Sequence, residues 1–244
     1  MTRAADLCVK SAREHGADSA LIWTQDALKK TEFYRENKAL LDQPRGCGFW
    51  SFKPFVLSQE MQGLSNGQFI IWADAGIQII NNLHYVIDRM EPGCDLWAYS
   101  NEWNHCDWTK RDVIDSVWPG SQWSDYGKQA QASVLFIRIS DYTRGLVAEW
   151  LKWCLFEGGR LIDDSPSRAA NHEGFREHRH DQSIFSTLLY REKIAMRQWA
   201  VKYLTFEPMR APGYPADDDL PVLYLHHRCR DANWHEYESR TQCL

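Results

Sequence analysis

The stretch Gln68-Phe-Ile-Ile-Trp-Ala-Asp74-Ala-Gly76 carries the strongest signal in this chain, because a run of apolar residues ends in a carboxylate followed by small residues. Ile, Phe and Trp favour buried strands, and Asn66-Gly67 just before the run indicates a turn. Asp74 is therefore predicted at the carboxyl end of a central strand, where open α/β sheets bind ligands. The alternative is that Asp74 only caps the following turn.

A second polar segment, Glu177-His-Arg-His-Asp181-Gln182-Ser183, lies directly before an apolar pattern of helical spacing. The first amides of a helix are unpaired and carry the positive end of its dipole, so we expect Asp181 to be ionised. The alternative is that Asp181 or Ser183 is only an N-cap. A cap does not account for the two histidines and the arginine beside it, so this segment is predicted to contribute to a site.

Composition limits the class of protein. With 244 residues, of which 44% are hydrophobic and 13% aromatic, the chain can bury one substantial core. We expect a single domain in which residues 1–205 form the main body and residues 206–244 add a Pro-rich segment and a final strand. A net charge of −5 without a basic block argues against nucleic-acid partners. The apolar runs are too short to span a bilayer, and no signal peptide opens the chain, so we expect a soluble, cytoplasmic protein.

The seven cysteines are an odd number and form no Cys-x-x-Cys pair. This pattern argues against a disulfide framework and against a thiolate zinc site, and it fits a reducing compartment.

Hydrophobic periodicity predicts alternating helices and strands. Helices are expected over residues 2–14, 26–41, 54–64 and 141–156, with a short helix capped by Thr109 and another after Asp181. Strands are expected over residues 19–23, 69–73, 96–99, 131–139, 161–162 and 221–227. This order predicts an α/β fold with a mostly parallel sheet covered on both faces. The glycines of Arg45-Gly-Cys-Gly allow unusual backbone angles, so this loop is predicted to approach something closely.

Four segments together resemble a known family. They are Arg45-Gly-x-Gly-Phe-Trp-x-Phe-Lys53-Pro54, Phe69-Ile-Ile-Trp-Ala-Asp74-Ala-Gly76, Trp108-Thr-Lys110 and His178-Arg-His180-Asp181-Gln182-Ser183. In this order they resemble small GT-A type nucleotide-sugar glycosyltransferases of bacterial polysaccharide clusters and large algal viruses, over about residues 18–228. The resemblance implies a Rossmann-like GT-A fold and transfer of a sugar from a nucleoside diphosphate, with a UDP-sugar such as UDP-xylose favoured, to a glycan acceptor.

The resemblance also implies roles for residues around Asp74. Asp74 matches the first Asp of the Asp-x-Asp signature, which meets the donor ribose or a divalent cation, Mn²⁺ or Mg²⁺, on the diphosphate. Gly76 stands where the second Asp is usual, which removes the carboxylate that contacts the metal most directly and leaves metal dependence open. A C-terminal histidine often completes such a site. His226 or His227 is the candidate, and at most one of them, because adjacent strand residues point to opposite faces.

The remaining roles follow from the other matching segments. Asp181 is the candidate catalytic base, or the group that stabilises an oxocarbenium-like sugar if the reaction retains configuration. The candidates that neutralise the leaving diphosphate are Lys53, Lys110, Arg179 and a bound cation. Residues expected to bind the donor are Arg45, Gly46, Asp74, Ala75, Gly76, Lys110, Arg179, His180 and Gln182. Trp103 and Trp108 are expected on the acceptor side, and the Pro-rich segment 208–221 is expected to act as a lid.

Two other classes of protein stay open. A catalytically silent carbohydrate-binding protein would use tryptophans as stacking platforms, namely Trp103, Trp108, Trp118 and Trp123. A metal-dependent hydrolase would use histidines and Asp181, namely His172, His178, His180, Asp181, His226 and His227, although the sequence has no compact motif such as His-Glu-x-x-His.

Overall fold

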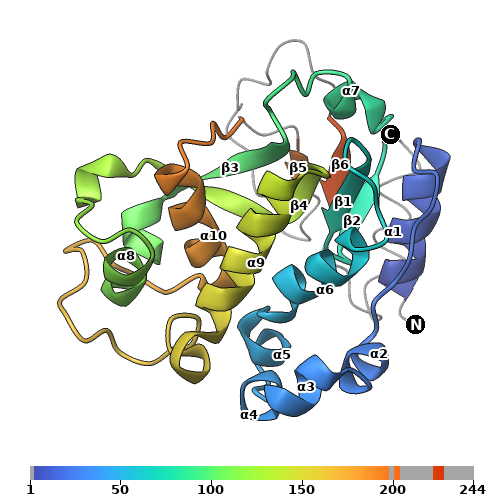
Figure 1. The fold of residues 1–244 in the computed structure, drawn as a ribbon. Coiled ribbons are helices and arrows are strands. Elements are labelled where there is room, and N and C mark those ends of the chain that lie inside the picture. The colour runs from blue at the N-terminus through green and yellow to red at the C-terminus, as the bar shows by residue number, and fades with distance from the viewer. Residues whose placement is uncertain (1–2, 198–200, 204–221, 228–244) are drawn as a thin grey trace.

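The computed structural model describes residues 3–197, 201–203 and 222–227 (Figure 1). The α-helices are α1 (Arg3–Glu14), α2 (Gln25–Lys29), α3 (Glu32–Glu36), α4 (Lys38–Leu41), α5 (Gly46–Phe49), α6 (Phe52–Met61), α7 (His84–Ile87), α8 (Arg111–Val117), α9 (Asp141–Leu155) and α10 (His180–Arg191). The strands are β1 (Phe69–Ala73), β2 (Ile77–Ile79), β3 (Leu96–Asn104), β4 (Lys128–Arg138), β5 (Val201–Tyr203) and β6 (Tyr224–His226). The expected boundary at residue 205 and the expected lid over 208–221 lie outside the described residues.

Strand β4 is the centre of the main sheet, whose order is β1-β4-β3. β1 pairs with the carboxyl half of β4, with Phe69 opposite Arg138 and Ala73 opposite Val134. β3 pairs along the other edge of β4, and its register shifts between Ala98 and Tyr99. Both pairings are antiparallel. The strand predicted over 131–139 is therefore confirmed, and it holds the sheet together.

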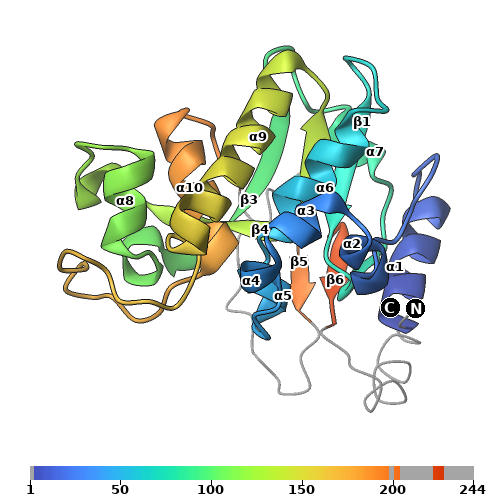
Figure 2. The ribbon, with the colours of Figure 1, turned by 60° about the horizontal axis from the view of Figure 1, so that its bottom comes forward.

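Both faces of β4 are buried, which explains its nearly continuous apolar sequence. Leu135 and Ile137 pack into a core with α6, α9 and α10. Val134 and Phe136 point the other way, into a core with α1, β2 and β6. Figure 2 shows α6, α9 and α10 lying together over one face of the sheet. Since side chains alternate along a strand, one strand supplies both cores.

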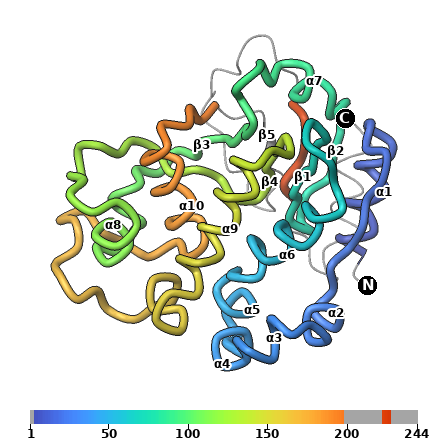
Figure 3. The backbone as a smooth tube through the Cα atoms, in the orientation of Figure 1, coloured from blue at the N-terminus to red at the C-terminus, as the bar shows by residue number. Residues whose placement is uncertain are grey.

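The second sheet joins segments that are far apart in the sequence. β6 pairs antiparallel with β2 and parallel with β5. Helix α1 covers β2, and the Ser11 hydroxyl accepts a hydrogen bond of 3.0 Å from the Ile79 amide. Figure 3 shows the start of the chain, in blue, running beside β2, with the red strand β6 next to it. The predicted first helix and last strand are thus confirmed and lie close to the end of β1.

The mixed α/β composition is confirmed, but the predicted mostly parallel sheet is wrong for the described strands. Among them only β5 and β6 run parallel. The prediction assumed strands over 19–23 and 161–162, and neither forms: residues 19–23 have no regular structure, and residues 161–162 form a turn. Without these two strands the strict helix-strand alternation that favours parallel crossovers is lost.

Two helix predictions also need correction. The helix expected over 26–41 is broken into α2, α3 and α4, since the Thr24 and Thr31 hydroxyls each cap a new short helix. Thr109 does not cap α8, because its hydroxyl lies 3.2 Å from His105 Nδ1 and Lys110 occupies the N-cap position. Helix α9 agrees with expectation and opens on a reciprocal cap between Ser140 and Thr143.

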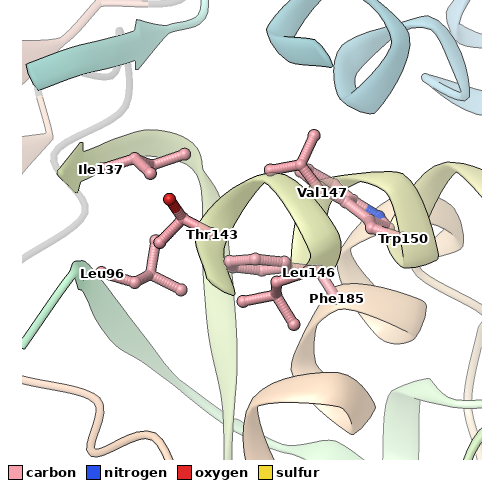
Figure 4. Close-up of a pocket in the computed structure, with 7 residues that line it drawn as sticks. All are labelled: Leu96, Ile137, Thr143, Leu146, Val147, Trp150 and Phe185. Carbon is pink, nitrogen blue, oxygen red and sulfur yellow. The ribbon is translucent and has the colours of Figure 1, made fainter. Parts of the chain in front are cut away.

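Among the described residues, no helix has the length and apolarity needed to cross a membrane. A small pocket lies between α9, α10 and the β3-β4 edge (Figure 4). Its lining is Leu96, Ile137, Thr143, Leu146, Val147, Trp150 and Phe185. Apart from the Thr143 hydroxyl and the Trp150 indole N–H, which donates to the Asp181 carbonyl oxygen, these side chains are apolar. The pocket is therefore a packing gap in the core and not a place for a polar ligand.

The double burial of β4 predicts a large effect of truncating one of its side chains. Leu135 is fully buried, so Leu135→Ala should lower the free energy of unfolding by about 2–5 kcal/mol. Leu21 is 59% exposed, and Leu21→Ala should change it by less than about 0.5 kcal/mol. Urea unfolding of both variants measures this, and similar midpoints would contradict the assignment of β4 to the core.

Candidate functional site

Lys53 lies at the start of α6, directly after an unusual turn of the backbone. Residues 46–50 all have positive φ, from 50° at Cys47 to 81° at Gly48, so the chain makes one left-handed turn before α6 begins. Non-glycine residues rarely adopt this conformation, and its cost must be met by the surrounding packing. The turn directs the start of α6 inward, and Lys53 is only 4% exposed there. Pro54 lies in the first turn of α6, as predicted, where its missing N–H is tolerated.

The predicted close approach of this glycine loop is confirmed, but its neighbour is the chain itself. A Cβ on Gly48 would lie 2.8 Å from the Leu40 carbonyl oxygen, and one on Gly46 would lie 2.5 Å from the Trp50 ring. Both glycines are therefore needed for packing against α4 and within the turn. Gly46 stays a predicted donor-binding residue, but its glycine character has this structural explanation.

The main feature of the site is a buried ammonium between two carboxylates. Lys53 Nζ lies 3.1 Å from Asp74 Oδ1, 3.4 Å from Asp181 Oδ2 and 3.1 Å from the Ala132 carbonyl oxygen. The four residues come from α6, the end of β1, the start of α10 and the middle of β4. Three segments that the sequence singled out separately are thus brought together. Burial lowers the pKa of Lys53, but the two carboxylates outweigh it and the pKa is raised, so the ammonium stays charged.

Asp74 is the outermost member of this cluster. Its side chain is 30% exposed, whereas those of Lys53 and Asp181 are each 5% exposed. Trp72 Nε1 donates a hydrogen bond of 2.9 Å to Asp74 Oδ1. Trp72 and Asp74 are two residues apart along the strand direction, which places them on the same face. Asp74 follows the carboxyl end of β1, as predicted, but β1 is an edge strand of the sheet and not the central strand that was expected.

Asp181 lies in the first turn of α10 and is buried. The loss of water raises its pKa from 3.8 to about 6, against the opposing pull of Lys53. Within the described part of the chain, Asp181 Oδ2 accepts no hydrogen bond, although Lys53 lies at ion-pair distance. The Trp150 indole donates to the Asp181 backbone carbonyl at 3.1 Å and fixes this turn to α9. A carboxyl group that titrates near pH 6 can both hold and accept a proton close to neutral pH.

The two histidines beside Asp181 bond to the protein backbone. His178 Nε2 lies 2.9 Å from the Leu161 carbonyl oxygen, and its Nδ1 lies 3.4 Å from the Lys110 amide. His180 Nδ1 lies 2.8 Å from the Ile162 carbonyl oxygen. Burial lowers the pKa of both imidazoles, so they are neutral at pH 7. These rings bond to the carbonyl groups of the 161–162 turn, where a strand was predicted.

Lys110 performs a similar structural task. Its ammonium lies 2.6 Å from the Arg160 carbonyl oxygen, and 3.2 and 3.0 Å from the carbonyl oxygen and Oδ1 of Asp163. The residue is 2% exposed. The structure therefore does not bring Lys110 into the Lys53 cluster. Its predicted role in donor binding is untested, and these contacts give it a sufficient structural role.

The side chains of Arg45 and Gln182 also contact other side chains of the protein. Arg45, which is exposed, pairs with Asp164 at 3.3 Å and with Glu177. Gln182 donates to Gln129 Oε1 at 2.6 Å, so its side chain is directed toward β4. Ala75 is exposed in the turn after Asp74. Of this group, Ala75 and Arg45 lie where a ligand could reach them.

An aromatic platform, defined here as Trp103, Trp108 and Arg179, adjoins the start of α10, where the Arg179 amide donates a hydrogen bond of 3.0 Å to the Trp108 carbonyl oxygen. The two indole rings stack with centroids 4.8 Å apart and an interplanar angle of 28°. The Arg179 guanidinium lies 4.4 Å from the Trp103 ring centroid and 5.6 Å from that of Trp108. A guanidinium that stacks through its face keeps its N–H edge for hydrogen bonds. Arg179 thus lies with the predicted acceptor residues and only two residues from Asp181.

The final strand ends beside the Asp74 turn. Ile77 pairs with His226, and the His227 amide donates a hydrogen bond of 2.9 Å to the Gly76 carbonyl oxygen. Both histidines are buried, and burial lowers the pKa of His227 to about 4. The backbone of this strand end therefore lies beside the turn that follows Asp74. The role of either histidine as a metal ligand stays a prediction.

The residues around Asp74 do not favour a divalent cation. An ammonium already lies 3.1 Å from Asp74 Oδ1, and the indole of Trp72 donates to the same oxygen. Gly76 adds no ligand atom beyond its backbone. Across residues 3–197, 201–203 and 222–227, no three His, Cys, Asp or Glu side chains are grouped so that they could hold a metal ion. The predicted Mn²⁺ or Mg²⁺ stays a prediction.

The ligand set proposed for a metal-dependent hydrolase is not assembled by these contacts. His178 has both ring nitrogens directed at backbone groups. His172 lies apart, with its ring edge-on to Trp123 and 3.4 Å from Asp107. A ligating histidine needs one nitrogen lone pair for the metal, which His178 does not have in this arrangement.

Sequence reasoning missed three members of the site. They are Trp72, the Ala132 carbonyl group and Trp150, which contact Asp74, Lys53 and Asp181 respectively. Trp72 could have been found from the two-residue strand period, which places it on the face of Asp74. A backbone carbonyl leaves no signal in the sequence, and Trp150 is one of twelve tryptophans.

Comparisons with known proteins give a distant structural similarity. No family model matches the sequence, and no curated protein matches it. Among solved structures, the apo form of mouse xyloside xylosyltransferase 1 is similar, with 14% sequence identity and a TM-score of 0.40. The similarity covers 80% of this chain and 69% of that one. Similarity at this level has no bearing on the activity or the substrates of this chain.

The structural role of Lys110 predicts a loss of stability on removing its charge. Lys110→Met would leave two carbonyl oxygens and the Asp163 carboxylate without their ammonium, so the free energy of unfolding should fall by about 2–4 kcal/mol. Lys10 is an exposed lysine on α1, so Lys10→Met should change the free energy of unfolding by less than about 0.5 kcal/mol. Equal thermal or urea midpoints for the two variants would show that the Lys110 contacts contribute little.

The raised pKa of Asp181 predicts a specific pH dependence of stability. Between pH 4 and 6 the folded state keeps a proton on Asp181 that the unfolded state has released, so stability decreases as the pH rises. Between pH 4.5 and pH 6.5 the titration of Asp181 should lower the free energy of unfolding of wild type by about 2 kcal/mol. Asp181→Asn lacks this titrating group, so its free energy of unfolding should not show this decrease. Urea unfolding at both pH values measures the difference. Wild type and Asp181→Asn curves that shift equally with pH would contradict it, and Asp88→Asn, at an exposed carboxylate, should follow wild type.

Proposed function

We propose that this protein is a glycosyltransferase that moves a sugar from a nucleoside diphosphate donor, with a UDP-sugar favoured, to a hydroxyl group of a glycan acceptor. The observation that carries the proposal is the meeting of Lys53, Asp74 and Asp181 in one cluster. These residues lie in three separate segments, and each segment is one by which the sequence resembles nucleotide-sugar glycosyltransferases of the GT-A type.

Asp74 is the member that a donor can reach. Its side chain is partly exposed at the end of β1, and its orientation is set by Lys53 and Trp72. A carboxylate held in this way is a strong acceptor for a hydroxyl group, such as those of a ribose. We therefore assign Asp74 to the donor, with the exposed Ala75 and the Gly76 backbone beside it.

Asp181 is the group we assign to the acceptor hydroxyl. With a pKa of about 6, it is mostly ionised at pH 7 and can take the proton of a hydroxyl group as that group attacks the sugar. Asp181 is buried, so this role requires that the acceptor hydroxyl group gain access to it. Lys53 keeps both carboxylates in place and is a positioning residue in this structure, because its ammonium is enclosed by protein oxygens.

The leaving diphosphate needs positive charge close to it. Lys110 contacts the 160–163 turn, and Lys53 is enclosed by protein oxygens. We assign this task to Arg179, whose guanidinium lies 4.4 Å from the Trp103 ring centroid. Arg179 lies on the aromatic platform and two residues before Asp181. Arginine suits this task because its planar N–H edge matches phosphate oxygens.

A catalytically silent carbohydrate-binding protein is the second candidate. The stacked Trp103 and Trp108 favour it, since indole faces suit the apolar faces of sugars. The two candidates differ in turnover: a binding protein would retain a sugar and would not release the nucleotide from a donor.

The proposal predicts different losses in matched carboxylate variants. The purified protein is incubated with UDP-xylose, other UDP-sugars and GDP-sugars, each with simple glycoside acceptors, and release of the nucleoside diphosphate is measured. Asp181→Asn should reduce the rate by roughly 10²- to 10⁴-fold, as expected for loss of a general base. Asp74→Asn should weaken donor binding, measured by calorimetry, while Asp88→Asn should behave as wild type. A folded wild-type protein that neither binds nor cleaves any of these donors would exclude the transferase.

A further inference from the structure

We propose that Asp74 binds its ligand without a divalent cation, because Lys53 already occupies the position of positive charge that a metal ion would fill. This inference rests on the proposed function for the identity of the ligand, which would be a hydroxyl group of a nucleotide sugar. The metal-free character of Asp74, however, concerns this chain alone and can be tested without any nucleotide.

The first argument is the direct competition between Lys53 and a cation. Lys53 Nζ lies 3.1 Å from Asp74 Oδ1 and 3.4 Å from Oδ2, so both oxygens already face a full positive charge. A divalent ion on Asp74 would lie within a few ångströms of this ammonium. The ammonium is buried, so water screens the repulsion poorly.

The second argument is that Lys53 cannot easily withdraw. Its ammonium also contacts the Ala132 carbonyl oxygen and the buried carboxylate of Asp181. Moving Lys53 away would leave Asp181 as an unpaired buried charge, which is unfavourable. The side chain starts from α6 behind the left-handed turn at residues 46–50, so the backbone that carries it is also constrained.

The third argument concerns the remaining ligands. Divalent Mg²⁺ and Mn²⁺ need several oxygen ligands, and protein sites usually supply one or two free carboxylates. Here Trp72 Nε1 donates to Asp74 Oδ1 at 2.9 Å, and an N–H donor does not share that lone pair with a metal. Gly76, two residues further on, contributes no carboxylate. Asp74 is thus prepared as a hydrogen-bond acceptor, and its partial exposure lets a hydroxyl group donate to it.

The test uses Mn²⁺ alone and the full chain. Wild type should show no saturable change in melting temperature and no uptake of Mn²⁺ in an electron paramagnetic resonance titration. Lys53→Ala removes the ammonium and leaves Asp74 and Asp181 as neighbouring carboxylates, so this variant should be destabilised and should recover stability as Mn²⁺ is added. Lys10→Ala, at an exposed lysine, should ignore Mn²⁺ as wild type does.

Two outcomes would overturn the inference. One is saturable Mn²⁺ binding by wild type that disappears in Asp74→Asn. The other is a folded Lys53→Ala that does not respond to Mn²⁺, which would show that the ammonium does not stand in a cation position. If Lys53→Ala does not fold, the wild-type and Asp74→Asn titrations decide the matter alone.

A nucleotide arm separates this inference from the proposed function. Binding of UDP or a UDP-sugar is measured by calorimetry in EDTA and in Mn²⁺, and we expect dissociation constants that agree within about twofold. Nucleotide binding that is more than about tenfold weaker in EDTA would be consistent with the proposed transferase function but would contradict the inference that Asp74 binds its ligand without a metal ion. Absence of nucleotide binding under both conditions would exclude the proposed transferase function. The Mn²⁺ titrations would still test whether Asp74 binds a metal ion.

Discussion

A buried ammonium needs negative charge around it, and this requirement links the main parts of the structure. Lys53 is 4% exposed, and an unpaired charge at such depth would cost several kcal/mol. The end of β1, the middle of β4 and the first turn of α10 must therefore all meet at the start of α6. The same contacts keep Asp74 oriented toward the surface and Asp181 directed inward. Stability and the proposed chemistry thus depend on one set of distances, so a change at Lys53 is expected to affect both.

The parts of the site that could be predicted are those with a local signal. Asp74 follows an apolar run bounded by a turn, and Asp181 precedes a helical pattern, so both positions could be read from neighbouring residues. The hydrogen-bond partners of His178, His180 and Lys110 could not be predicted from neighbouring residues. A polar side chain near a helix start can contact a ligand or a carbonyl group of its own chain, and the choice depends on residues 160–163, which lie elsewhere in the sequence. A strand was expected over residues 161–162, so the need of this turn for hydrogen-bond donors was not anticipated.

The prediction that the strands run mostly parallel was wrong for a related reason. Periodicity identified β1, β3, β4 and β6, because burial on one or both faces leaves a pattern along each strand. Pairing is a relation between distant segments, and no local pattern states whether β1 runs with β4 or against it. The left-handed turn at residues 46–50 is a similar case. Its glycines signalled unusual backbone angles, but the contacts of Gly48 with Leu40 show that the angles are needed for packing.

The central place of β4 has a consequence for how the chain is made. β1 ends at Ala73, and its partner strand is complete only at Arg138, so β1 has no neighbour in the main sheet while the 65 residues between them are synthesised. At typical ribosomal speeds this interval is roughly 3–13 seconds. From the time it leaves the ribosome until β4 follows, the apolar sequence Phe69-Ile-Ile-Trp-Ala is an unpaired strand, of the kind that associates with other chains. Nascent chains of this protein should therefore depend on chaperones that shield this segment until β4 arrives, and slow translation between residues 73 and 138 should lower the yield of folded protein.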